Sequence, residues 1–289
     1  MTTREQWIAG ARPKTLAAAI APVLVGTSFA GYNATFLHAL LALIVALSLQ
    51  VGVNYANDYS DGIKGTDDDR VGPMRLVGSG AATPDAVKKA AFLSFFIASL
   101  AGLVLASRTS WFLVALGALC ILAAWTYTGG PKPYGYQALG EVSVFIFFGV
   151  VATVGTYYVQ TESVSREVLL ASFAMGALAC AILVLNNLRD LDKDQLSQKK
   201  TLAVVMGDKD TRNLYKWLMF FALVMSVALT FFSFYYLLAL ISLPLVSKSV
   251  RAVTSGASGS ALIDLLAKTG RIQIIYAVAL SFAAWLVAR

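Results

Sequence analysis

The sequence is poor in charge, histidine and cysteine. Charged residues make up 13% of its 289 positions, and it holds one histidine and two cysteines. Soluble domains carry about 25% charged residues, so this scarcity excludes an ordinary water-soluble enzyme. His38, at the edge of an apolar run, is expected to have no chemical role. Cys120 and Cys180 lie within apolar runs, which favours packed thiols over a disulfide framework.

The sequence instead contains many long apolar runs. Apolar residues make up 58% of the chain, and its mean hydropathy is +0.70. A membrane-spanning helix needs roughly 20 mostly apolar residues, and the runs lack the alternation of a barrel strand. We predict an all-α polytopic membrane protein, a single domain over residues 1–289, with about nine transmembrane helices and cytoplasmic polar loops that cap a central cavity. The predicted spans are 15–31, 36–56, 87–107, 109–128, 138–159, 167–187, 215–232, 234–248 and 272–288.

The basic residues indicate orientation. With the N-terminus inside the cell, all but three of the 23 lysines and arginines fall on the inner side, as the positive-inside rule requires. The net charge of +7 is therefore mainly topological, and no nucleic-acid partner is predicted. The polar stretch before the first run is unlike a cleavable signal peptide, so we expect that span to be retained. The prediction is a multi-pass plasma-membrane protein with its N-terminus and long polar loops in the cytoplasm.

Two of the inner segments are rich in acids and resemble each other. The second span runs into NYANDYSD and the sixth into NNLRDLDKD. If the helix continues past the membrane edge, residues three, four or seven apart share one face. Asn54, Asp58 and Asp61 then form one stripe of oxygen atoms. Asn187, Asp190 and Asp194 form the other.

Stripes of carboxylates need a counter-charge. Like charges on adjacent turns destabilise a helix, and a membrane interface makes their desolvation worse. Mg²⁺ reverses that balance, because it binds one or two carboxylates and fills its octahedron with phosphate oxygens and water. Two facing stripes predict a site for metal ions bridged by a diphosphate, open to lipid where a hydrocarbon tail can lie. This spacing alone suits any cation or metal–phosphate complex.

The motifs add a family resemblance. NYANDYSDGIKGTD at 54–67 and NNLRDLDKD at 186–194 resemble the two aspartate-rich motifs of the UbiA superfamily of intramembrane aromatic prenyltransferases. ARPKTLAAAIAPVLVGT, RVGPMRLVGSG, YTGGPKPYGYQALGE and KKTLAVVMG resemble one branch of it, the 1,4-dihydroxy-2-naphthoate polyprenyltransferases of menaquinone synthesis. Many members of the superfamily carry a third acid where this chain has Gly65, and the branch has a G-x-D form instead, which leaves the role of Asp67 open.

The resemblance implies a function and a set of site residues. The protein is expected to transfer a polyprenyl group from polyprenyl diphosphate to 1,4-dihydroxy-2-naphthoate with loss of CO₂, using Mg²⁺, with two ions expected. Catalytic roles are expected for Asp58, Asp61, Asp190, Asp194, Lys64 and Arg75. The expected diphosphate-binding residues are Lys14, Lys64, Arg75 and Lys200. The expected metal ligands are Asn54, Asn57, Asp58, Asp61, Asp67, Asn187, Asp190 and Asp194. Tyr127, Tyr134 and Tyr136 either stabilise the allylic cation or form an interfacial aromatic belt.

Two alternatives stay open at this point. The same catalyst acting on another aromatic acid, such as 4-hydroxybenzoate or homogentisate, would use the same diphosphate site. A cation-coupled transporter would use the acids as an ion site. Transporter sites lie near the bilayer midplane, whereas these acids are predicted at the cytoplasmic edge, which favours the enzyme.

Overall fold

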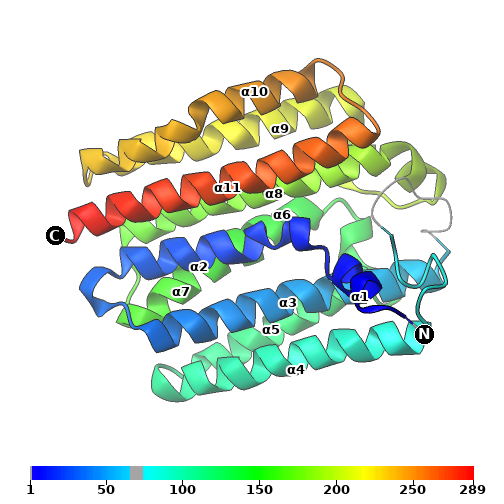
Figure 1. Ribbon diagram of the computed structural model, residues 1–289, viewed down its shortest axis with the longest axis horizontal. Helices are drawn as coiled ribbons and strands as arrows, with labels where there is room; N and C mark the ends of the chain where they lie inside the picture. Colours follow the sequence, from blue (N-terminus) through cyan, green and yellow to red (C-terminus); the bar gives the residue numbers. More distant parts are fainter. Residues whose placement is uncertain (1, 66–73) are drawn as a thin grey trace.

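The protein is a bundle of long helices that run back and forth along one direction (Figure 1). The computed structural model describes residues 2–65 and 74–289. The α-helices there are α1 (Arg4–Ala11), α2 (Ala17–Phe29), α3 (Phe36–Ile63), α4 (Pro84–Arg108), α5 (Phe112–Thr126), α6 (Gly140–Val144), α7 (Ala152–Thr161), α8 (Arg166–Leu196), α9 (Leu202–Leu229), α10 (Leu243–Thr254) and α11 (Ser260–Val287). They are joined by the 3₁₀-helical segments η1 (Pro13–Thr15), η2 (Gly31–Asn33), η3 (Tyr134–Tyr136) and η5 (Phe234–Ser242) and by the π-helical segment η4 (Phe145–Val151).

Each predicted span falls on a helix. Within the described residues seven helices are long and apolar enough to cross a membrane, and a pair bent by 53°, Arg4–Thr15 with Ala17–Phe29, is an eighth candidate. The remaining predicted span corresponds to α5, which has 15 residues and is about 22 Å long at 1.5 Å per residue. The prediction of an all-helical, multi-pass membrane protein is confirmed.

Local signals explain where the helices begin and bend. Thr35, Thr83, Ser165 and Thr201 cap the first turns of α3, α4, α8 and α9 by accepting a backbone N–H three residues on, a preferred use of these residues. The bend before α2 follows Arg12, which has a φ of 55°, and Pro13. The predicted turn near Phe232 separates α9 from η5, and the regular helix α10 resumes next to Pro244.

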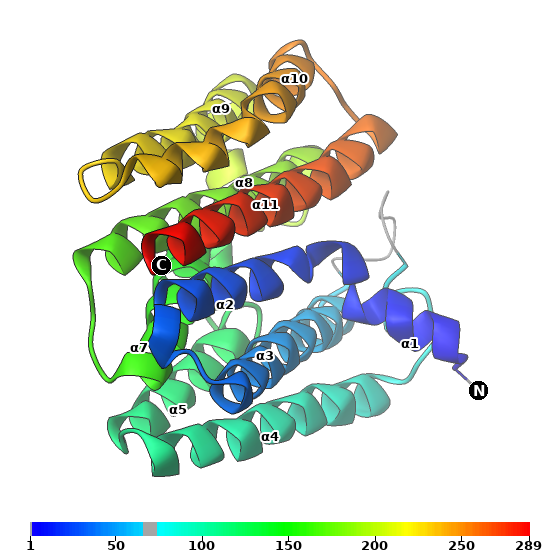
Figure 2. The same ribbon diagram turned by 60° about the vertical axis from the view of Figure 1, so that its left-hand side comes forward.

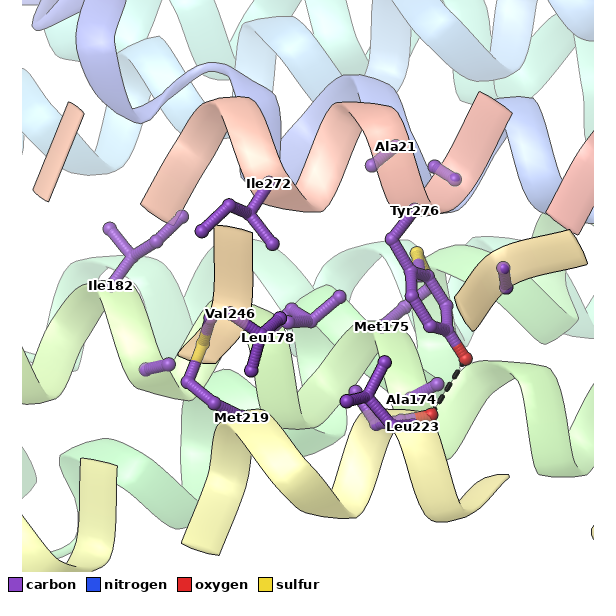
Figure 3. Close-up of a cluster of buried hydrophobic side chains, with 14 of the residues drawn as sticks. Ala21, Ala174, Met175, Leu178, Ile182, Met219, Leu223, Val246, Ile272 and Tyr276 are labelled. Carbon is purple, nitrogen blue, oxygen red and sulfur yellow. Dashed lines mark hydrogen bonds between the residues drawn. The ribbon is translucent and has the colours of Figure 1, made fainter. Parts of the chain in front are cut away.

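The largest hydrophobic core surrounds α8. Its buried side chains come from α2, α8, α9, η5, α10 and α11, and Figure 3 shows Met175 and Leu178 of α8 within it. The hydroxyl of Tyr276 donates to the carbonyl of Ala222 (2.7 Å), so its polar end is satisfied inside the core. A separate, smaller cluster joins α3 and α4 to the segment 74–82. The chain therefore has one densely packed half and one half built around a smaller core.

A close helix crossing joins η4 to α8. A Cβ atom at Gly149 would lie 2.4 Å from the Cα of Gly176, so only glycine permits this approach. The backbone of η4 has π-helical hydrogen bonding, which often marks functional sites. Phe147 and Phe148 of this segment line the main cavity. Figure 2 shows α8 to α11 on one side of the bundle and α3, α4 and α5 on the other.

Candidate active site

A cavity of about 900 Å³ lies among α2, α3, α4, α5, η4, α7 and α8. Much of its wall is apolar and comes from membrane-spanning segments. Its polar lining gathers where α3 and α8 end and includes Arg12, Lys14, Asn54, Asn57, Asp61, Arg75, Thr128, Asn186, Asn187, Arg189, Asp190, Asp194 and Lys199. An apolar chamber with a charged end suits a ligand that has a charged head and a hydrocarbon tail.

The first acidic motif is helical over residues 54–63, because α3 continues to Ile63. Asn54, Asn57 and Asp61 line the cavity, whereas the predicted stripe had Asp58 in place of Asn57. Thr128 Oγ1 donates to Asn57 Oδ1 (2.8 Å). Tyr136 donates its hydroxyl proton to Asp61 Oδ1 (2.6 Å). Two side chains from the segment 127–141 thus hold the first motif in place.

Asp58 lies on the side of α3 next to the residues that line the cavity. It is fully buried, and its two oxygens accept the backbone N–H groups of Leu76 (2.8 Å) and Val77 (3.0 Å). Asp58 is not among the cavity-lining residues, whereas Arg75, the residue before these two, is buried and lines the cavity. In the structure Asp58 anchors the backbone that carries Arg75. Its role as a metal ligand stays a prediction.

The second motif lies on the last turns of α8. Arg189 contacts Asp190 with two hydrogen bonds, Nε to Oδ1 (2.8 Å) and Nη2 to Oδ2 (2.6 Å). Asn187 donates its Nδ2 proton to Oε1 of Glu141 (2.9 Å). Asn187, Asp190 and Asp194 all line the cavity, as their predicted common face requires.

Lys199 joins the two motifs. Its ammonium lies 3.6 Å from Asp61 and 4.0 Å from Asp194, and 5.0 Å from the centre of the Tyr136 ring. The two predicted halves therefore meet at one place. Lys200, the predicted phosphate ligand, is exposed, and its backbone oxygen accepts the N–H of Ala138 (2.8 Å). Phosphate binding by Lys200 stays a prediction, and Lys199 is the lysine of this pair that lines the cavity.

Lys64 and the tyrosines border this polar end. Lys64 donates to the carbonyl oxygen of Thr128 (2.7 Å), and burial lowers the pKa of Lys64 below its ordinary value. Tyr127 and Tyr134 line the cavity with their rings edge to face, 5.4 Å apart. The Tyr136 ring instead lies beside the ammonium groups of Lys64 and Lys199. The cation-stabilising role stays a prediction for all three tyrosines.

The structure brings most of the predicted residues to one end of the cavity. Asp67 lies outside the described residues. Sequence reasoning did not assign site roles to Thr128, Glu141 or Arg189. The first two belong to YTGGPKPYGYQALGE at 127–141, a stretch whose only signal in the sequence is its resemblance to the family. Their contacts with Asn57 and Asn187 give that stretch a physical role.

The donor set fits Mg²⁺ bound together with a diphosphate. The residues that converge supply carboxylate and amide oxygens, which are the ligands that Mg²⁺ prefers. Among the described residues, no group of three or more histidine, cysteine, aspartate or glutamate side chains is arranged to hold a metal ion. Mg²⁺ typically binds one or two carboxylates and completes its coordination with phosphate oxygens and water. Arg12, Lys14 and Arg75 add positive charge at the same end, where an anion binds favourably.

Comparison with known proteins confirms the expected family. A sequence profile described as the UbiA prenyltransferase family matches residues 19–261. The chain belongs to this family. A 1,4-dihydroxy-2-naphthoate octaprenyltransferase of Mycobacterium tuberculosis is 50% identical over 97% of both chains. The Escherichia coli protein of the same name is 38% identical over 92% of this chain and 90% of its own.

Solved structures share the fold. A UbiA homologue from Archaeoglobus fulgidus bound to DMAPP and Mg²⁺ superposes with a TM-score of 0.69 over 97% of this chain and 99% of its own, at 14% identity. The apo structure of a UbiA homologue from Aeropyrum pernix K1 gives a TM-score of 0.74 over 93% of this chain and 97% of its own, at 15% identity. These matches confirm the family's helical fold for this chain.

Proposed function

We propose that the protein transfers a polyprenyl group from polyprenyl diphosphate to 1,4-dihydroxy-2-naphthoate, with loss of CO₂, to give demethylmenaquinol. One observation carries the proposal: two acidic helix ends, from α3 and α8, meet at the charged end of an apolar intramembrane cavity. The cavity matches a diphosphate head on an isoprenoid tail. The names of the related proteins agree with the function that the sequence motifs predict.

The charged end would hold the diphosphate. Asn57 and Asp61 of α3 and Asn187, Asp190 and Asp194 of α8 would hold Mg²⁺, and two ions fit the division into two motifs. When bound, Mg²⁺ supplies positive charge that neutralises the leaving diphosphate. Lys14, Lys64, Arg75 and Lys199 would bind the remaining phosphate oxygens. The apolar wall would hold the prenyl chain and keep water from the reacting carbon.

The reaction would begin with ionisation of the allylic C1–O bond, and the electron pair of that bond leaves with the diphosphate. The electron-rich naphthoate carbon that bears the carboxylate attacks C1 and forms the new C–C bond. Loss of CO₂ returns its electron pair to the ring and restores aromaticity. Tyr127 and Tyr134, which line the cavity, would face the allylic cation through their rings.

The orientation is also part of the proposal. The positive-inside distribution and the common location of both motifs support a site at the cytoplasmic face. A transporter is disfavoured, because its ions would bind near the bilayer midplane. Another aromatic acceptor remains the second candidate, since the diphosphate end would serve either one.

One assay tests the proposed acceptor. Membranes that contain the protein are incubated with Mg²⁺, a polyprenyl diphosphate and one acid at a time: 1,4-dihydroxy-2-naphthoate, 4-hydroxybenzoate or homogentisate. We expect a prenylated naphthoquinol, with one CO₂ released per product. Prenylation of a different acid, with none of the naphthoate, would refute the proposed acceptor. Equal turnover in the presence of a metal chelator would refute the proposed metal site.

A further inference from the structure

The segment 127–141 contacts both acidic motifs. Thr128 donates to Asn57 and Tyr136 donates to Asp61. Glu141, at the start of α6, accepts from Asn187 of the second motif. One stretch of chain therefore links two helix ends that lie far apart in the sequence. Of the three contacting residues in this segment, Glu141 is the one with a buried carboxyl group.

Burial of the Glu141 carboxyl group is unfavourable for the stability of the fold. It is 7% exposed, and its Oε2 is buried without a hydrogen-bond partner among the described residues. Within the same part of the chain, it forms no ion pair of 4.0 Å or less. Burying a carboxyl group without a full set of hydrogen-bonding or cationic partners costs free energy. A functional role therefore explains the buried Glu141 side chain better than a structural role does.

The contact determines which end of the Asn187 amide faces the cavity. Asn187 lines the cavity and Glu141 does not, so Glu141 lies behind it. A carboxylate oxygen accepts and does not donate, whereas the amide has one end of each kind. With its nitrogen directed to Glu141 Oε1 (2.9 Å), the amide leaves its oxygen for the cavity, one helical turn from Asp190.

We propose that Glu141 is a positioning residue, which holds the Asn187 amide with its oxygen toward the metal–diphosphate complex. The inference rests on the proposed function, because it takes Asn187 as part of that site. Groups that orient a metal ligand from behind typically contribute 10–100-fold to metal affinity. Glu141 touches neither the reacting atoms nor the diphosphate.

The test measures metal binding without turnover. Full-length protein in detergent micelles is titrated with Mn²⁺ and inorganic diphosphate, and bound Mn²⁺ is followed by electron paramagnetic resonance. We expect Glu141→Met to weaken Mn²⁺ binding by about 10–100-fold with at most a small fall in melting temperature, because a single hydrogen bond is lost. As a matched control, Gln160→Leu also removes a buried polar side chain, whose bonds are to Thr35 at the opposite end of α3. It should leave Mn²⁺ binding unchanged.

An exchange of the pair makes the test specific. Asn187→Asp sets two carboxylates against each other and should weaken Mn²⁺ binding. Glu141→Gln added to that variant restores a donor facing an acceptor, with one oxygen of the substituted side chain toward the cavity, and should recover most of the lost affinity. Wild-type affinity in Glu141→Met, or no recovery in the double variant, would overturn the proposal.

The same data separate this inference from the proposed function. If wild-type protein binds Mn²⁺ in a Glu141-dependent way but does not prenylate the naphthoate, the positioning role stands and the acceptor is wrong. If wild-type protein binds no Mn²⁺ with diphosphate, the metal site and the positioning role are both overturned.

Discussion

The two acidic motifs end helices of opposite character. In the most apolar 18-residue stretch of α3, 11% of the residues are buried inside the protein, whereas in α8 the share is 78%. α8 runs through the main core, and α3 lines the cavity and packs against α4. Both nevertheless bring carboxylates to the same end of one cavity.

The difference shows two ways of holding a charged site. The second motif rests on α8, whose position is set by packing on many sides. The first motif depends on segments that cross over it: Leu76 and Val77 bond Asp58, and Thr128 bonds Asn57. We therefore expect the α8 side to act as a rigid platform and the α3 side to tolerate changes in packing but depend on its crossing segments.

The largest effect should come from removing a carboxylate of either motif. Asp61→Asn and Asp190→Asn should each lower the rate of prenyl transfer by at least about 100-fold, because each would remove charge stabilisation of the diphosphate. Initial rates with saturating prenyl diphosphate measure this. Asp192→Asn, an exposed acid on α8, is the matched control. If one of the two variants kept full activity, the motifs would not form a single site.

The next largest effect should be on stability, which we expect to differ between substitutions in α8 and in α3. Leu178→Ala removes a fully buried side chain of α8 and should cost about 2–5 kcal/mol of the free energy of unfolding. Leu49→Ala, on the cavity wall of α3, should cost less than half as much, since it enlarges a space that already exists. Unfolding by denaturing detergent in micelles measures both. Equal losses of unfolding free energy in the two variants would contradict the difference expected between α8 and α3.

The third prediction concerns the crossing segment 74–80. Asp58→Asn replaces one acceptor oxygen with a donor that faces a backbone N–H, so Arg75 should lose its support. The KM for prenyl diphosphate should rise about 10-fold, as expected for lost charge-assisted hydrogen bonds, and amide hydrogen exchange in 74–80 should accelerate. Asp85→Asn, from an exposed pair with Lys89, should change neither. Weakened Mn²⁺ binding with normal exchange in 74–80 would instead make Asp58 a metal ligand.

The smallest effect should be a pH dependence at Lys64. Burial lowers the pKa of Lys64, Asp61 opposes this, and the charge of Lys199 adds to the lowering. Lys64 therefore loses its proton at a lower pH than an ordinary lysine. Affinity for prenyl diphosphate should fall a few-fold as the pH rises through that lowered pKa, and Lys64→Arg should move the fall to higher pH. KM measured against pH checks this, with Lys209→Arg as the control. An unchanged profile in Lys64→Arg would contradict it.

Much of the site was predictable because it is encoded locally. Apolar runs show where helices lie, and helical spacing shows that Asp190 and Asp194 share a face. Both α3 and α8 continue as helices past their apolar runs, which is the condition on which the predicted stripes depended. Spacing alone placed Asp58 on the stripe of α3, whereas in the structure its neighbour Asn57 lines the cavity and Asp58 does not. Spacing also did not distinguish Lys199 from Lys200.

Those choices depend on chain segments that are remote in the sequence. Asp58 is directed to Leu76 and Val77, and Lys199 lies between Asp61 and Asp194. The amino-acid sequence by itself determined the helices, their membrane character and the two acidic ends, because hydrophobicity and i to i+4 spacing act within one segment. Only the tertiary structure decided which side chains face the cavity, because that depends on which neighbours cover the rest of each helix.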